Sequence, residues 1–166
     1  MRNKRALSLT LLIDADVLCH QMSYAATTRV DWSKGNVWDA PTLDHAEKPR
    51  SDTTDCTEVL RPELMRARIR GFMAQMMDDF SATDAIIVLS DRGYNFRKQL
   101  APYYKAKRKP KPTLWEQTRA YCETGVSDQF RVECWPGLEG DDVIGILHTG
   151  EFAGRSMMVT LSLIHI

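Results

Sequence analysis

Near-continuous apolar runs mark candidate buried strands along the chain. The first run, Leu7–Ile13, is followed at once by two aspartates, Asp14 and Asp16. The second run, Ala85–Leu89, is followed by a serine and then Asp91. A strand that is covered on both faces has this composition, and its carboxyl end is where ligands bind in an open parallel sheet. We therefore expect a sheet whose strands end in carboxylates.

Helical patterns separate these runs. Cys19–Ala26 is short, whereas Pro62 opens a long amphipathic helix. Its apolar side carries Met65, Ile69, Phe72, Met73, Met76, Met77 and Phe80. Leu114–Glu123 predicts another helix, which begins at a Thr113–Glu116 capping box and ends at Gly125.

A third strand is expected at Gln129–Trp135, a helix within LEGDDVIGIL, and a last strand at Ser156–Thr160. Alternating strands and helices predict an α/β fold with a parallel sheet. Parallel crossovers would bring Asp91 to the same sheet edge as Asp14. The polar stretch Thr27–Leu60 is expected to be a long loop or insertion.

The composition is that of a globular protein, but it does not indicate which kind of partner the protein binds. The chain has 166 residues, is 43% hydrophobic, and balances 22 basic against 22 acidic residues. These values suit one globular domain. No apolar segment is long enough to cross a bilayer, and the basic opening segment lacks a cleavage site. The cysteines, Cys19, Cys56, Cys122 and Cys134, lack metal spacing and suggest reduced thiols in a cytoplasmic protein.

Acidic residues also gather at the start of the LEGDDVIGIL helix. Glu139, Asp141 and Asp142 lie within four residues. A helix start favours one carboxylate through its dipole, but three should repel one another unless a cation neutralises them. Asp14 has two open roles, as a ligand in the crevice or as the cap of the following helix. With Asp91, these residues predict an oxygen-lined site for magnesium or manganese.

Such a site suits phosphate chemistry, and one candidate is a phosphatase of the haloacid dehalogenase-like class. Asp14-Ala15-Asp16-Val17 fits its nucleophile motif, with Asp14 forming an aspartyl phosphate and Asp16 acting as acid and base. The four residues that intervene before the GDD triplet, beginning at Pro136, do not fit that class. The middle of the chain also stays unexplained by it.

That middle is Asp91–Pro112, which is basic and aromatic. It carries Arg97, Lys98, Lys105, Lys107, Arg108, Lys109 and Lys111 interleaved with Tyr94, Phe96, Tyr103 and Tyr104. Basic side chains hold phosphates and aromatic rings stack on bases, a combination typical of single-stranded nucleic-acid surfaces. A charge run is more often only a solvated face. Its position directly after Asp91 favours the nucleic-acid interpretation.

Four blocks together resemble the 5'-nucleases, which include flap endonucleases and the 5'-to-3' exonuclease domain of bacterial DNA polymerase I. The similarity to bacteriophage 5'-to-3' exonucleases is greatest. The blocks are LLIDADVL, LSD, FRKQLAPYYKAKR and LEGDDVIGIL, in matching order and approximate spacing.

The resemblance implies a PIN-like (Rossmann-like) nuclease core with a basic helical arch. It implies hydrolysis of DNA that has a free 5' end, flap or nick, with RNA–DNA hybrids as a further substrate. Asp14, Asp91, Glu139 and Asp141 match the ligands of a first magnesium or manganese ion, and Asp142 faces a second. Lys105 and Arg108 match arch residues that neutralise the scissile phosphate. Further DNA contacts are expected at Arg97, Lys98, Tyr104, Lys107 and Lys109.

The ending departs from this pattern. In the family, a DxD pair and a helix-hairpin-helix follow the strand that matches Ser156–Thr160. The chain reads LSLIHI there and stops. We expect residues 1–160 to be the nuclease domain, with an insertion at about 27–60 and a non-native tail at 161–166. We also expect a monomer that binds one ion, is impaired in catalysis, and acts in the cytoplasm. A DNA-binding remnant without turnover is the remaining alternative.

Overall fold

A four-stranded, all-parallel sheet forms the centre of the protein. The computed structural model describes residues 8–31, 36–38, 56–93, 95–101, 103–105 and 110–160. The sheet has the order β6-β5-β1-β7. Its strands are β1 (Thr10–Asp14), β5 (Asp84–Val88), β6 (Arg131–Glu133) and β7 (Ser156–Val159). The α/β fold with a parallel sheet, predicted from the alternating pattern, is confirmed.

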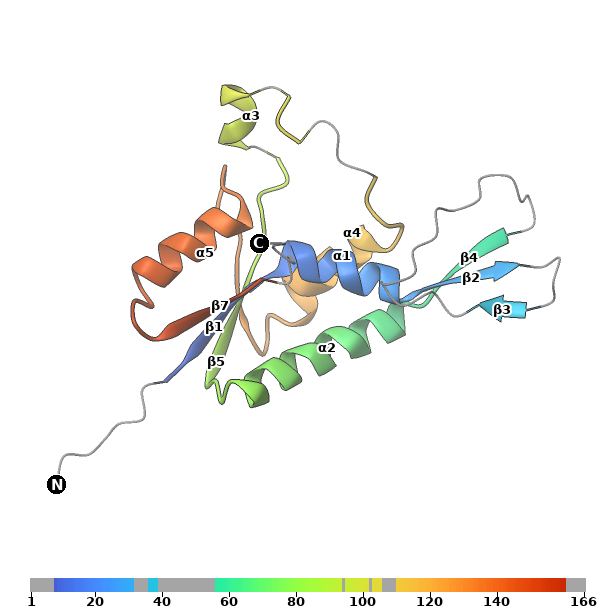
Figure 1. Ribbon diagram of the computed structural model, residues 1–166, viewed down its shortest axis with the longest axis horizontal. Helices are drawn as coiled ribbons and strands as arrows, with labels where there is room; N and C mark the ends of the chain where they lie inside the picture. Colours follow the sequence, from blue (N-terminus) through green and yellow to red (C-terminus); the bar gives the residue numbers. More distant parts are fainter. Residues whose placement is uncertain are drawn as a thin grey trace, which may run out of the picture.

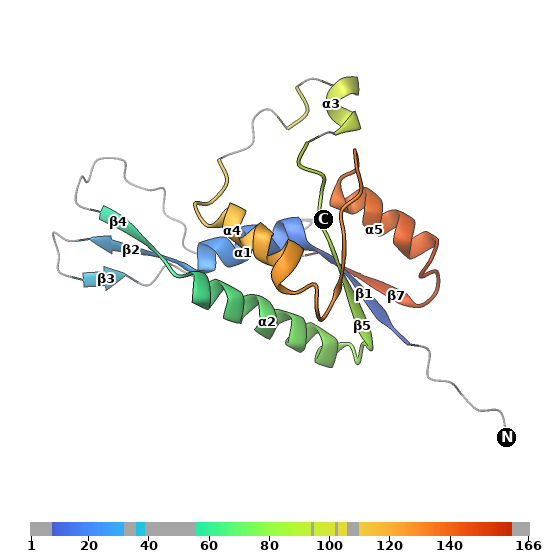
Figure 2. The same ribbon diagram turned by 180° about the vertical axis from the view of Figure 1, so that it is seen from behind.

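Helices cover both faces of this sheet (Figures 1 and 2). Successive side chains of a strand point to opposite faces, so Leu11 and Ile13 join one core cluster while Leu12 joins the other. The first cluster packs against three helices and the second against α5. The helices are α1 (Ala15–Ala25), α2 (Pro62–Asp79), α4 (Trp115–Ala120) and α5 (Gly140–Thr149). Burial on both faces explains the near-continuous apolar runs.

The strand order sets where chemistry can occur. The chain runs from β1 outward to β5 and β6, then returns to the other side of β1 as β7. In open parallel sheets, ligands bind outside the carboxyl ends of the strands, where the order reverses. Asp14 is the last residue of β1 and pairs in register with Val88, near the end of β5. Residues that follow these two strands therefore meet at one edge.

The long amphipathic helix begins at Pro62, as the sequence predicts. Met65, Ile69 and Met73 are buried, but Phe80 is 39% exposed and does not belong to the buried stripe. The helix ends at Asp79, and Phe80 is its C-terminal cap. Because Phe80 lies outside the helix, the helical period does not determine where its side chain points. None of the helices in the described ranges is both long enough and apolar enough to span a membrane.

The predicted Thr113–Glu116 capping box is wrong. The α4 helix starts at Trp115, its capping residue is Leu114, and no side chain caps it. Glu116 instead accepts a hydrogen bond from Arg92 at 2.7 Å. The predicted end at Gly125 is confirmed, because α4 widens into a π-helical turn, η3 (Tyr121–Gly125).

The sequence predicts a long loop or insertion at 27–60; part of this stretch is a second sheet, so the loop interpretation is wrong for those residues, and the insertion stays a prediction. The antiparallel strands of this sheet have the order β3-β2-β4 and project away from the parallel sheet (Figure 1). They are β2 (Thr27–Asp31), β3 (Asn36–Trp38) and β4 (Cys56–Leu60). Main-chain hydrogen bonds pair β2 with β3 and with β4. Such pairing does not require a run of apolar side chains, so no hydrophobic pattern in the sequence reveals these strands.

Candidate active site at the carboxyl edge of the sheet

Asp14 takes one of the two roles that the sequence left open for it, that of a helix cap. It ends β1 and caps α1, where its Oδ1 accepts hydrogen bonds from the backbone of Asp16 at 3.0 Å and Val17 at 3.4 Å. Both contacts use the same oxygen. Burial raises the pKa of Asp14 from its ordinary value of 3.8 to about 6, and repulsion from Asp16 and Asp141 adds to the shift. The cap is confirmed, and the ligand role stays a prediction.

Asp91 follows β5 and joins two loops at this edge. Its Oδ1 accepts from the backbone N–H of Gly93 at 3.0 Å and its Oδ2 from that of Gly137 at 2.7 Å. Its own N–H donates to the carbonyl of Leu138 at 3.0 Å. Asp91 thus positions the loop that leads into α5, where the other acidic residues lie.

Glu139, the residue before α5, is buried beneath a group of donors. Its carboxylate accepts from Lys105 Nζ at 2.6 Å, Asn95 Nδ2 at 2.6 Å, Tyr104 Oη at 3.1 Å and Arg97 Nη1 at 3.1 Å. Burial alone would raise its pKa, but the hydrogen bonds from Lys105 and Asn95 outweigh it and lower the pKa. Glu139 is therefore held as a carboxylate.

Asp142 makes a two-pronged ion pair with Arg97. The distances are 2.6 Å from Nη1 to Oδ2 and 2.5 Å from Nη2 to Oδ1. The Arg97 guanidinium lowers the pKa of Asp142 below its usual range. Asp142 also accepts from the backbone N–H of Glu139 at 3.2 Å, so part of its role is that of a helix-start acid.

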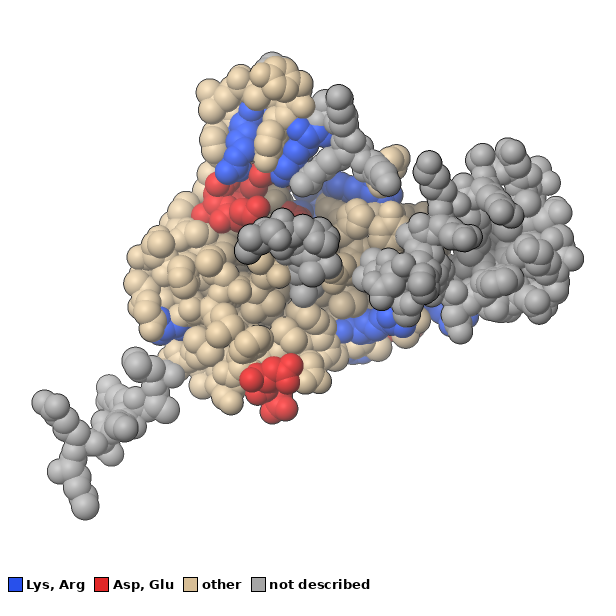
Figure 3. Space-filling view, viewed as in Figure 1, with Lys and Arg blue, Asp and Glu red and all other residues tan. Residues whose placement is uncertain are grey.

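Basic side chains thus lie directly against acidic ones at this edge (Figure 3). The cations come from the predicted arch, of which α3 (Phe96–Leu100) is the described helix. Lys105 has a positive φ of 59°, which a residue with a side chain adopts only at a cost of about 1–3 kcal/mol. The contacts from Lys105 and Tyr104 to Glu139 hold this strained backbone in place.

The structure describes only some of the remaining residues that are predicted to contact DNA. Lys98 is exposed on α3. Lys107, Arg108 and Lys109 fall outside the residues that the structure describes. Their predicted roles on DNA and the scissile phosphate therefore stay predictions.

Two site residues were missed by the sequence reasoning. Asn95 caps α3 and donates to Glu139, and no pattern marks it. Arg119 is 2% exposed and bonds Asp16 at 3.0 Å. A signal for Arg119 did exist, because it follows Trp115 by four residues and precedes Cys122 by three, which places a cation in an apolar helical stripe.

The donor chemistry fits a divalent cation around Asp14 and Asp141. The first is buried with like charges beside it, and the second makes no hydrogen bond through its side chain to any other described residue. Within the described ranges, however, no three acidic, histidine or cysteine side chains stand ready as a cage. Glu139 would have to give up its ion pair with Lys105 before it could bind the metal ion. The predicted set of five carboxylate ligands therefore stays a prediction.

The phosphatase alternative loses support at Asp16. Acid–base catalysis would need its carboxylate free beside Asp14, but Oδ1 is paired with Arg119 and Oδ2 accepts from the N–H of Ser90 at 3.1 Å. Both carboxylate oxygens of Asp16 are thus already engaged in hydrogen bonds with the protein.

Replacing Asp14 by asparagine should stabilise the metal-free protein at alkaline pH. The folded pKa is raised, so the stability linked to protonated Asp14 is present below about pH 4 and is lost as pH rises through about 6. In chelator at about pH 8, we expect Asp14→Asn to raise the free energy of unfolding by up to about 3 kcal/mol, at roughly 1.4 kcal/mol per pKa unit. Urea denaturation at about pH 4 should show no gain. Asp128→Asn, at an exposed turn, controls for the lost charge, and an Asp14→Asn gain that is equal at both pH values would contradict the burial effect.

Comparison with known families agrees with this geometry. The profile described as "5'-3' exonuclease, N-terminal resolvase-like domain" matches residues 63–162, which is more than half of the chain. The matched range contains β5, the described arch residues, α5 and β7. No curated protein matches the chain. With a parallel sheet, acidic strand ends and a family match over more than half its length, the chain belongs to the 5'-3' exonuclease family through its resolvase-like N-terminal domain.

Proposed function

We propose that the protein is a metal-dependent 5'-to-3' exonuclease or flap endonuclease that hydrolyses phosphodiesters in DNA with a free 5' end. The observation that carries the proposal is the contact between the arch cations and the acidic start of α5. Lys105 and Arg97 reach Glu139 and Asp142 at 2.5–3.1 Å. One edge of the sheet therefore offers carboxylates for a cation and cations for a phosphate.

The chain's own residues would bind and orient the substrate. Lys105 and Arg97 are 28% and 30% exposed at their side chains, so a phosphate can reach them without unfolding the core. A phosphate oxygen and a carboxylate compete for the same donors, so DNA binding would transfer these cations from Glu139 and Asp142 to the backbone phosphate. Tyr104, which lies beside Lys105, would then be released from Glu139 to stack on a terminal base.

Releasing Glu139 and Asp142 leaves the edge strongly negative. Asp14, Asp91, Glu139 and Asp141 would hold one magnesium or manganese ion, and Asp142 would face a second. When bound, such an ion polarises the phosphodiester and lowers the pKa of a water molecule. The bidentate contact between Arg97 and Asp142 favours one ion over two in the free protein. Action on RNA–DNA hybrids, a monomeric state, a cytoplasmic setting and closeness to bacteriophage enzymes remain predictions.

The activity can be tested with enzyme in excess over DNA labelled at the end of a single-stranded 5' arm. We expect release of labelled 5'-terminal products in manganese, and loss of release in Asp14→Ala and in Asp141→Ala, because both remove oxygen ligands. DNA whose ends are closed by hairpins should stay uncut. Binding of the open DNA without any release would support the non-catalytic alternative. A phosphoryl group trapped on Asp14 from a small phosphate ester would support the phosphatase instead.

Lys105→Met should have opposite effects on the two ligands. It removes a phosphate contact, so DNA binding should weaken and the slope of log affinity against log salt should fall by about one. It also frees Glu139 from its competing cation, so manganese should bind at least several-fold more tightly by calorimetry.

Lys98→Met is the matched control for this change. It lies in the same segment, is exposed, and has no ion pair with a described acid. We expect it to weaken DNA binding and leave manganese affinity unchanged. If both variants left manganese affinity unchanged, Lys105 would not compete with the ion for Glu139.

A further inference from the structure

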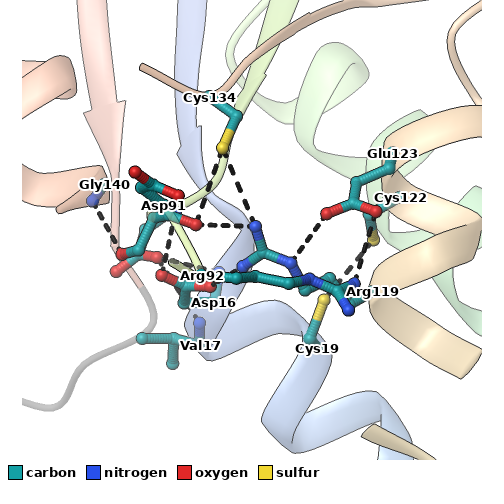
Figure 4. A network of polar contacts seen from close by, with 12 residues as sticks. Asp16, Val17, Cys19, Asp91, Arg92, Arg119, Cys122, Glu123, Cys134 and Gly140 are labelled. Carbon is teal, nitrogen blue, oxygen red and sulfur yellow. Dashed lines mark hydrogen bonds and ion pairs between the residues drawn. The ribbon is translucent and has the colours of Figure 1, made fainter. Parts of the chain in front are cut away.

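Arg119 is a buried cation that contacts four chain segments at the carboxyl end of the sheet (Figure 4). It lies on α4 with its side chain 2% exposed. Its Nη1 donates to Asp16 at 3.0 Å, its Nε to Glu123 at 2.8 Å, and its Nη2 to the carbonyl of Ser90 at 2.6 Å. Nη2 also approaches the Cys134 sulfur at 3.8 Å. The fork therefore joins the start of α1, the middle of η3, and the residues after β5 and β6.

Ser90 carries these contacts on to the acidic helix. Its N–H donates to Asp16 at 3.1 Å, and its carbonyl accepts from Arg119. Its hydroxyl accepts from the N–H of Gly140 at 2.8 Å. Gly140 is the first residue of α5 and lies between Glu139 and Asp141. A series of hydrogen bonds thus leads from Arg119 to Gly140, whose two neighbours in the chain are predicted metal ligands.

The sheet alone does not fix these ligands. The pairing of β5 with β6 ends at Val88 and Glu133, whereas Asp91 and Glu139 lie in the segments beyond. The contacts of Ser90 and Asp91 with the chain before and at the start of α5 fix the distance between those segments. A guanidinium can bridge several acceptors in a fixed plane, which a lysine ammonium cannot do.

We propose that Arg119 is a positioning residue, which acts through Asp16 and Ser90 to set the spacing of the carboxylates from β1, β5 and α5 for a divalent cation. This inference rests on the proposed function, because it assumes that those carboxylates bind metal. It assigns Asp16 to the frame of the site and not to the ion. Groups that orient metal ligands in this way typically change metal affinity 10–100-fold when they are replaced.

Arg119→Lys separates position from charge. Lysine keeps the positive charge beside Asp16 and Glu123 but cannot make all the fork contacts at once. We expect its manganese dissociation constant, measured by calorimetry, to rise by about tenfold or more. Metal-free DNA binding should not change, because Arg119 is buried away from the DNA-facing side chains. A role through charge alone would leave manganese affinity at the wild-type value.

Ser90→Ala provides a second variant with no change of charge. It removes only the acceptor for Gly140, and we expect it to weaken manganese binding in the same direction. If Arg119 acts through Ser90, the double variant should lose less affinity than the product of the two single losses.

Two controls distinguish positioning from general stability. Arg131→Lys changes an exposed arginine that also pairs with two carboxylates, Glu133 and Glu151, and should keep wild-type manganese affinity. Ile69→Val loosens the core under α2 and should lower the melting temperature without weakening manganese binding. A loss in Ile69→Val as large as that in Arg119→Lys would overturn the inference.

The outcomes also separate this inference from the proposed function. Wild-type binding of manganese with unchanged affinity in Arg119→Lys and Ser90→Ala would overturn the positioning role and leave the nuclease proposal intact. No manganese binding by the wild type would overturn the metal-dependent function and this inference with it.

Discussion

Repulsion between carboxylates at the end of a buried sheet is the constraint on which the site depends. Asp14 and Asp16 come from one strand end, and Asp141 lies close enough to raise the pKa of Asp14. Each additional negative charge there must be balanced by a cation or by protonation. The protein meets this requirement in three ways: Arg119 beside Asp16, Arg97 and Lys105 beside the start of α5, and a raised pKa at Asp14.

These three solutions differ in how easily they can be reversed. Arg119 is a buried charge whose three nitrogens all bond acceptors of the protein, so it cannot leave for another ligand and belongs to the permanent frame. Arg97 and Lys105 are partly exposed, and on the proposed function a phosphate would take them from their carboxylates. Asp14, with its pKa raised to about 6, gives up its proton as the pH approaches neutrality. On the proposed function, the edge would therefore accept a metal ion and DNA by replacing contacts that the free protein makes with its own side chains.

The sequence predicted the parallel sheet well, because strands buried on both faces must be apolar throughout. It predicted the acidic edge for the same reason, since carboxylates that directly follow such strands can only lie at their ends. It failed where main-chain pairing or polar contacts decide the structure. The antiparallel strands at 27–60 lack apolar periodicity, and Glu116 binds Arg92 and not the helix start. The pairing of Lys105 with Glu139 leaves no trace in spacing, because it joins residues that are far apart in the chain. The helical spacing marks Arg119 itself, but not its contact with Asp16, which lies 103 residues away.

The central claim is that one edge of the sheet exchanges its own cations for a divalent ion. A crystal of the protein grown with manganese would test it most directly, through the anomalous difference density of the bound ion. Our account predicts a peak coordinated by Asp14 and Asp141, with the Lys105 ammonium moved away from Glu139. No peak at this edge, or a bound ion with Lys105 still paired to Glu139, would contradict it.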